Sequence, residues 1–136
     1  LDIRVGCERT KFRFLAAAYG RVNSTWSLPM QVGWPIAKEL LFTTRVVEAE
    51  ESLQIGLLNH LVKSTELLDK ANELAEMIVN NDARMVQGIK KLLIEDIGES
   101  WENTYHKELN AQAKELAPTP VLEGFKPFID RKGRKA

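Results

Sequence analysis

The hydrophobic pattern divides the chain into a mixed front and a helical back. From Ser64 onward, apolar residues recur every three or four positions, which places them along one face of a helix. Polar capping residues and prolines separate these periodic segments. The pattern predicts helices that begin at Ser64 or Thr65, after Asn81 and Asp82, near Glu99, and at Pro120 with Thr119 as the N-cap.

The front of the chain is predicted to contain shorter secondary-structure elements. Alternation of apolar and polar residues is typical of a half-buried strand, and glycine and proline mark the breaks between elements. We therefore predict strands at residues 3–7 and 11–14, a helical turn at residues 15–19 that Gly20 stops, a helix from near Trp26 that residues 23–25 cap, and a helix from Pro35 to about Phe42.

Residues 44–62 are the most informative segment because they form one supersecondary pattern. A valine pair leads into a helix whose first turn is rich in glutamate, a charge that the helix dipole favours there. Ala49 and Leu53 give this helix a buried stripe, to which Ser52 could belong. Gly56 stands where helices end in a left-handed residue, and a short apolar strand completes the segment.

This segment resembles the T-G-R-x-x-x-A-x-E-A-x-x-x-G-L-V-x-x-V signature of the crotonase superfamily, the enoyl-CoA hydratase/isomerase fold. Other stretches match the family's motifs in the same order and at similar spacing, at residues 2–4, 12–20, 28–33, 37–45 and 123–132. The resemblance covers only the C-terminal half of that fold, so we expect a truncated chain.

The resemblance implies an α/β, mostly helical fold with two parts. Residues 1–62 would be a remnant of the crotonase-like ββα spiral core, made of short strands and helices. Residues 63–136 would be the C-terminal helical region that, in this family, builds a trimer.

Composition narrows the class of protein. The 136 residues suit one domain, and 44% apolar with 28% charged residues is ordinary for a soluble globular protein. Nineteen acidic residues balance nineteen basic ones, so charge gives no reason to expect nucleic acid or an anionic membrane. The single cysteine, Cys7, is expected in the core and fits a reducing compartment. With no signal peptide or long apolar run visible, we expect a cytoplasmic protein without a membrane span.

The catalytic chemistry of the family is not expected in this chain. In the family, two backbone amides stabilise the thioester oxygen as charge develops, and carboxylates move protons beside the carbonyl. The resemblance places the Gly-rich G-G-G-x-E stretch, which supplies an oxyanion amide and one catalytic Glu, before Leu1. It aligns the other catalytic Glu with Ala16, which cannot accept a proton. We therefore predict no catalytic residue here, and whether the chain is an enzyme stays open.

After the catalytic groups are excluded, the resemblance still implies contacts with an acyl-CoA thioester, the substrate in this family. Candidates for the substrate pocket are Ala16, Tyr19, Ser24 and Trp26. Trp26 suits a core position as well as a pocket wall. The resemblance also brings Arg131 and Lys132 to the CoA phosphates of a neighbouring subunit. A solvated basic terminus is the alternative interpretation of those two residues.

Other polar residues suit structural roles. His60 and His106 have no partners at metal-ligand spacing, so we expect no metal site and no cofactor. Trp101 and Tyr105, four residues apart, are better explained by helix packing or a subunit interface than by ligand stacking. We expect solvated carboxylates at Glu50, Glu51, Glu95, Asp96 and Glu99.

Two main hypotheses for the function follow. In the first, the chain is a crotonase-like fragment, inactive alone, of a protein that binds acyl-CoA in fatty acid metabolism and either hydrates enoyl-CoA, as a lyase, or isomerises it. In the second, it is a non-catalytic, self-associating structural module, because half of a spiral exposes an apolar face. Both predict a homo-oligomer, either a trimer or a dimer-based assembly. A small helical regulator that uses the basic tail is a remote third hypothesis.

Overall fold

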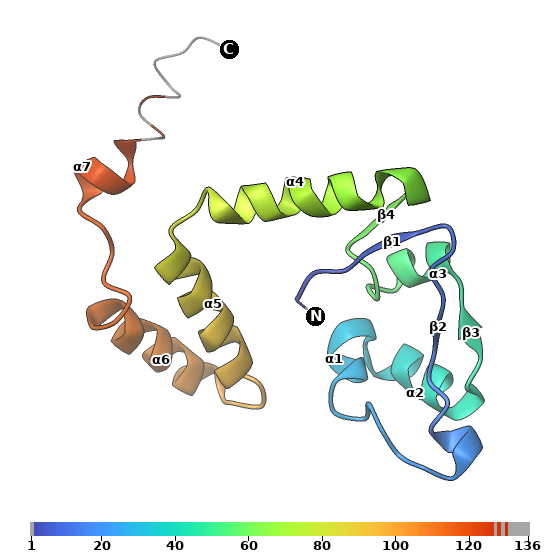
Figure 1. Ribbon diagram of the computed structural model, residues 1–136. Helices are drawn as coiled ribbons and strands as arrows, with labels where there is room; N and C mark the ends of the chain where they lie inside the picture. Colours follow the sequence, from blue (N-terminus) through green and yellow to red (C-terminus); the bar gives the residue numbers. More distant parts are fainter. Residues whose placement is uncertain (1, 127, 129, 131–136) are drawn as a thin grey trace. The chain divides into compact units, whose positions relative to one another are not determined.

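The computed structural model describes residues 2–126, 128 and 130, and the chain divides into two compact units (Figure 1). Unit 1 is Leu1–Glu76 and unit 2 is Met77–Ala136. Unit 1 contains strands β1 (Val5–Cys7), β2 (Phe12–Arg13), β3 (Val46–Val47) and β4 (His60–Val62), helices α1 (Leu28–Val32), α2 (Trp34–Thr43) and α3 (Ala49–Gln54), and the 3₁₀ helices η1 (Ala17–Tyr19) and η2 (Ser64–Glu66). Helix α4 (Leu67–Val79) crosses the boundary, and unit 2 continues with α5 (Ala83–Glu95), α6 (Trp101–Ala113) and α7 (Val121–Gly124).

The mixed front and helical back are confirmed within the described residues, where every element after β4 is a helix. In the same residues, no helix has the length and apolar character needed to cross a bilayer. Helix α5 begins as predicted, because the Asp82 carboxylate accepts hydrogen bonds from the backbone amides of Arg84 and Met85. The predicted cap at Thr119 is wrong, since Pro120 is the N-cap of α7 and makes no side-chain capping bond.

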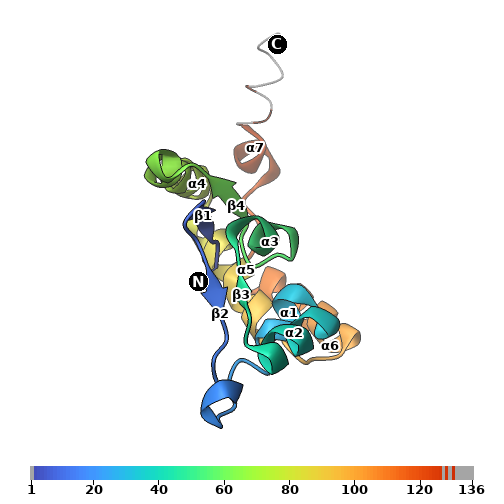
Figure 2. The same cartoon turned by 90° about the vertical axis from the view of Figure 1, so that its right-hand side faces the viewer.

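Two short strand ladders hold unit 1 together. Strands β1 and β4 pair in parallel, with Val5 opposite His60 and Cys7 opposite Val62. Strands β2 and β3 pair antiparallel, with Phe12 opposite Val47 (Figures 1 and 2). The second ladder is nested within the first along the sequence. Residues at the front of the chain are therefore joined to the end of the 44–62 segment.

The core of unit 1 lies between α1, α2 and β3. Helices contribute residues three or four apart, as expected for one buried face, and β3 contributes Val47. Phe12, Phe14, Ile36, Leu41 and Ile55 pack against this cluster from its edge. The buried residues of the cluster are Leu28, Val32, Ala37, Leu40, Val47 and Leu57. Cys7 is buried as predicted.

The buried stripe of α3 differs from the prediction. Leu53 is exposed, whereas Ser52 is fully buried. The Ser52 hydroxyl donates a hydrogen bond of 2.7 Å to the carbonyl oxygen of Glu48. Burying a hydroxyl group that has a local hydrogen-bond acceptor costs little free energy, so Ser52 can face the interior of unit 1. Gly56, with φ of 83°, has the left-handed conformation predicted for it.

The predicted cap of the helix near Trp26 is also wrong. Helix α1 begins at Leu28, with Ser27 as an N-cap that makes no side-chain hydrogen bond. Ser24 instead has φ of 56°, a left-handed conformation in which its carbonyl accepts a hydrogen bond from the Leu28 amide. A turn closed by this hydrogen bond therefore precedes α1.

Arg45 connects α2 to α3. Its Nε donates to Glu39 Oε1 at 2.8 Å, and its Nη1 donates to Glu51 Oε2 at 2.8 Å. The hydrogen bond from Arg45 lowers the pKa of the Glu51 carboxyl, with the positive charge acting in the same direction. A bidentate guanidinium–carboxylate pair of this kind fixes geometry as well as charge.

Glu51→Gln should change the pH dependence of stability in the acid range. The pKa of Glu51 is depressed in the folded state, so ionisation stabilises the fold above its unfolded pKa of about 4.3. This contribution is lost as the pH falls through the folded pKa. We expect the difference in urea midpoint between wild type and variant to be largest near neutral pH and to shrink on acidification. A difference that stays constant over the titration would contradict this assignment.

Candidate functional site

The four predicted pocket residues lie in the segment between β2 and α1. Ala16 precedes η1, and its carbonyl accepts hydrogen bonds from the amides of Tyr19 at 3.1 Å and Arg21 at 2.8 Å. Gly20 follows with φ of 64°, which ends the turn as predicted. The backbone of Ala16 therefore anchors a tight turn, and its side chain is a half-buried methyl group.

The side chains of this segment point largely to solvent. Tyr19 is 72% exposed and Trp26 is 73% exposed, while Ser24 is half-buried. Ala16 and Tyr19 share one turn, whereas Ser24 and Trp26 belong to the next turn, which precedes α1. Trp26 is thus not a core residue of unit 1. Arg131 and Lys132 lie outside the described residues.

The segment offers groups for binding but none for proton transfer near neutral pH. Residues 14–27 contain no carboxylate, thiol or imidazole, and Arg21 is their one charged side chain. Exposed aromatic rings contribute apolar area and stacking surfaces for a ligand. Among the described residues, no three His, Cys, Asp or Glu side chains gather as a metal ion would require.

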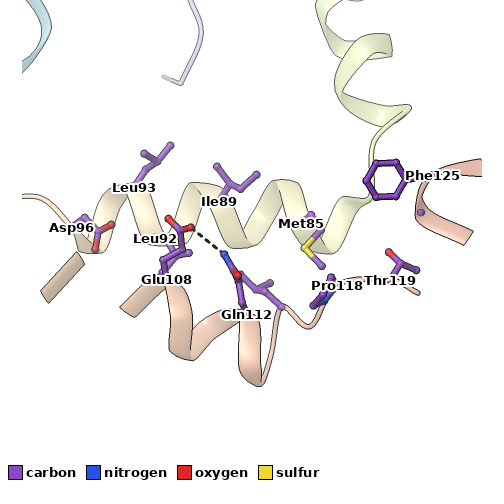
Figure 3. A pocket seen from close by; sticks show the side chains of 12 residues that line it. Met85, Ile89, Leu92, Leu93, Asp96, Glu108, Gln112, Pro118, Thr119 and Phe125 are labelled. Carbon is purple, nitrogen blue, oxygen red and sulfur yellow. Dashed lines mark hydrogen bonds between the residues drawn. The ribbon is translucent and has the colours of Figure 1, made fainter. Parts of the chain in front are cut away.

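A groove in unit 2 was not predicted from the sequence. It encloses about 610 Å³ and is mainly apolar, with Asp96 and Glu108 among its lining residues (Figure 3). Met85, Ile89, Leu92 and Leu93 line it from α5, where their helical spacing was visible in the sequence. Glu108 accepts a hydrogen bond of 3.0 Å from Gln112. Helix periodicity predicted an apolar face here, but an open groove depends on how far α6 and α7 cover that face.

The turn between α5 and α6 is fixed by Lys107. Its Nζ donates to the Glu95 carbonyl at 2.9 Å and to Glu99 Oε1 at 3.1 Å, and it lies 3.8 Å from Asp96 Oδ1. Hydrogen bonds from Asn103 and then Lys107 lower the pKa of Glu99. Asp96 is half-buried, and so is Glu51 in its pair with Arg45. The prediction of a solvated carboxylate was wrong for Asp96, whose Oδ1 is buried, whereas Glu51 keeps 36% of its side chain exposed.

Trp101 and Tyr105, for which helix packing or a subunit interface was expected, stack on each other with ring centroids 5.9 Å apart and planes 2° from parallel. Trp101 nevertheless remains 82% exposed. The pair therefore adds to the apolar surface of α6 and does not belong to a buried core.

The sequence and the fold both match proteins of one family. The family profile described as enoyl-CoA hydratase/isomerase matches residues 1–135. The enoyl-CoA hydratase EchA19 of Mycobacterium tuberculosis is 36% identical over 134 residues, which are 96% of this chain and 50% of the relative. The crotonyl-CoA hydratase of Syntrophomonas wolfei is 28% identical over 134 residues, which are 96% of this chain and 52% of the relative.

Solved structures give the same result. The enoyl-CoA hydratase from Bacillus anthracis matches with a TM-score of 0.85 and 26% identity, over 96% of this chain and 52% of that one. The enoyl-CoA hydratase/isomerase from Cupriavidus metallidurans matches with a TM-score of 0.86 and 26% identity, over 96% of this chain and 50% of that one. The chain thus spans about half the length of these relatives. Because the profile match extends over nearly the whole sequence and the fold agrees, the chain belongs to the enoyl-CoA hydratase/isomerase family.

Proposed function

We propose that this chain contributes part of an acyl-CoA-binding crotonase fold, and that the complete fold hydrates or isomerises enoyl-CoA. The family match over residues 1–135 carries the proposal. A Thermobifida fusca protein assigned as an enoyl-CoA hydratase was solved in complex with acetoacetyl-CoA. Its match covers 85% of this chain and 47% of the Thermobifida fusca chain, with 27% identity and a TM-score of 0.78. A cytoplasmic location belongs to the proposal and is supported by Cys7, which is a free thiol.

Within that fold, the chain's own residues have a binding role. The methyl group of Ala16 and the absence of any acid from residues 14–27 leave no proton acceptor there. Tyr19 and Trp26 present exposed rings that suit the apolar parts of an acyl-CoA. Arg131 and Lys132 remain predicted contacts to CoA phosphates. Residues 1–62 would be the remnant of the spiral core, and residues 63–136 the oligomerisation region.

The chain alone should not hydrate crotonyl-CoA. Hydration needs groups that stabilise the thioester oxygen and activate water, and Ala16 supplies neither. The measurement is the loss of enoyl absorbance after mixing with crotonyl-CoA, and the crotonyl-CoA hydratase of Syntrophomonas wolfei serves as the positive control. Turnover above the buffer rate would contradict the prediction.

A second candidate function is that of a self-associating structural module. It is favoured by large apolar side chains on the surface of unit 2, since exposed apolar patches mark interaction sites. These side chains are Ile89, Leu93 and Ile94 on α5 and Trp101, Tyr105 and Leu109 on α6.

Sedimentation at micromolar concentration should then show a trimer or a dimer-based assembly. Leu93→Glu should shift the distribution toward monomer, because it places a charge where apolar surface would be buried. Glu102→Gln, a change at a polar position of α6, is the matched control and should leave the distribution unchanged. A monomer at all concentrations would exclude this second function.

A further inference from the structure

The groove in unit 2 adjoins a smaller cavity that contains two aromatic rings. This cavity encloses about 210 Å³, and Trp101 and Tyr105 of α6 are among its lining residues. Asp96 and Glu108 line both cavities. Figure 3 shows Phe125 at one end of the larger groove and Asp96 at the other, with apolar side chains of α5 between them. An apolar groove therefore leads to a pocket that is aromatic and acidic.

The size of the groove suits a small ligand. Its volume of about 610 Å³ lies in the range of about 300–1,000 Å³ that is typical of small-molecule sites. Ile89 and Leu93, which line it, are 56% and 67% exposed. A ligand with an apolar chain would remove these side chains from water, which is favourable. Every residue that lines either cavity belongs to unit 2.

Glu108 gives the site a negative charge that no cation of the protein matches within the described residues. Its carboxylate accepts a hydrogen bond of 3.0 Å from Gln112, which is uncharged, and forms no ion pair in that part of the chain. Among the same residues, Asp96 is the only other charged one that lines either cavity. A charge interaction is stronger beside apolar side chains, where the effective dielectric constant is lower than in water. A cationic group is therefore favoured at this end of the groove.

Lys107 offsets only part of this negative charge. Its Nζ donates to the Glu95 carbonyl at 2.9 Å and to the Glu99 carboxylate at 3.1 Å. It lies 3.8 Å from Asp96 Oδ1, which is too far for a hydrogen bond. One lysine thus serves the carboxylates of Glu99 and Asp96, and it leaves Glu108 available to a cation from outside the chain.

Trp101 and Tyr105 add a surface that attracts cations. Their rings are parallel, and both line the smaller cavity together with Glu108. A cation over the face of an aromatic ring is attracted by the quadrupole of the ring, and proteins recognise quaternary ammonium groups in this way. Both side chains are exposed, so a ligand can reach them. The rings and the carboxylate therefore favour the same kind of head group.

We propose that unit 2 binds an alkylammonium ion, a small molecule with an apolar chain and a positively charged nitrogen. The chain lies in the groove against Ile89 and Leu93. The nitrogen lies beside the Glu108 carboxylate and the rings of Trp101 and Tyr105. This site goes beyond the proposed function, because its residues lie outside the segment 14–27 and its ligand has the opposite charge to the phosphates of CoA.

The test titrates the 136-residue chain with decyltrimethylammonium, below its critical micelle concentration, by isothermal titration calorimetry. We expect one ligand per chain, with NMR amide shifts confined to α5, α6 and α7. Decanoate has a similar chain but an anionic head, and it should bind roughly tenfold more weakly because it loses both the ion pair and the cation–π contact. Tetramethylammonium lacks the chain and should bind at least about tenfold more weakly. Equal affinity for decanoate, or amide shifts in unit 1, would overturn the proposal.

Matched variants locate the nitrogen. Glu108→Gln removes the charge at constant size and should weaken binding of decyltrimethylammonium roughly threefold to fivefold, as expected for an exposed ion pair. Glu102→Gln is the same change on the same helix, but Glu102 lines neither cavity, so binding should stay unchanged. Trp101→Leu should weaken binding roughly twofold to fivefold, because it removes one ring. Equal weakening by the two glutamate variants would contradict the proposal, since it would reflect overall charge alone.

Crotonyl-CoA separates this inference from the proposed function. It should not displace decyltrimethylammonium, because its phosphates would be repelled by Glu108. Displacement would place both ligands in one site and would contradict the inference. A chain that binds decyltrimethylammonium but no crotonyl-CoA would support the inference and count only against the binding role proposed for residues 14–27.

Discussion

Leu40→Ala should lower the free energy of unfolding of unit 1 by about 2–5 kcal/mol, as large-to-small changes in a packed core do. Leu40 is fully buried in α2 and belongs to the one core cluster that α1, α2 and β3 share. Removing its side chain loses apolar burial and leaves a cavity between three elements. Neighbouring side chains that are themselves tightly packed, such as Leu28 and Val47, can fill that cavity only in part.

The measurement is urea unfolding followed through NMR amide signals of α2. Leu68→Ala is the matched control, because Leu68 has the same side chain but is 75% exposed on α4. A surface substitution of this kind usually changes stability by less than about 0.5 kcal/mol. If the two variants lost equal stability, the core of unit 1 would not lie where the structure places it.

Gly56→Ala should destabilise unit 1 by about 1–3 kcal/mol, since it combines a left-handed backbone with a close approach. Gly56 has φ of 83°, a conformation that residues with a Cβ rarely adopt. A Cβ there would also lie 3.1 Å from the backbone carbonyl oxygen of Gln31, which cannot rotate away as a side chain would. The glycine therefore allows the end of α3 to approach α1.

Gly20→Ala separates the two contributions in the same unit. Gly20 also has a positive φ, of 64°, but a Cβ there would meet nothing within 4 Å. Its substitution should lower the free energy of unfolding by about 1 kcal/mol, which is the cost of placing a residue with a Cβ in the left-handed conformation. The additional loss of stability expected for Gly56→Ala measures the cost of the close approach between the added Cβ and the carbonyl oxygen of Gln31. Equal losses, measured by the same urea titration, would show that the close approach is not significant.

Local signals in the sequence predicted the elements well. Gly56 and Asp82 act through their own backbone or through neighbours two or three residues away, so their roles follow from local chemistry. Leu53 and Ser52 show where local reasoning fails. Which of two adjacent residues a six-residue helix buries depends on the helix's contacts elsewhere in the unit. The hydroxyl of Ser52 finds its acceptor at Glu48, the N-cap of the same helix.

The candidate site was less predictable. Family motifs located the segment between β2 and α1, but they gave no sign that Ser24 would adopt a left-handed backbone or that Trp26 would be exposed. Exposure depends on which surfaces cover a residue, and a single chain's periodicity does not contain that information. The apolar stripes of α5 and α6 were predicted as helix faces, and for Trp101 and Tyr105 a subunit interface was one of the two interpretations.

Both ladders of unit 1 join a strand that precedes residues 20–27 to a strand that follows them. That loop is mostly exposed, and no strand pair passes through it. A cut, an insertion or an exchange of residues there would leave both ladders and the core cluster with all their members, because α1 begins only at Leu28. The loop that carries Ser24 and Trp26 is therefore a place in unit 1 where the sequence can diverge without loss of the fold. Under the binding role proposed for it, a change of ligand preference can arise there independently of stability.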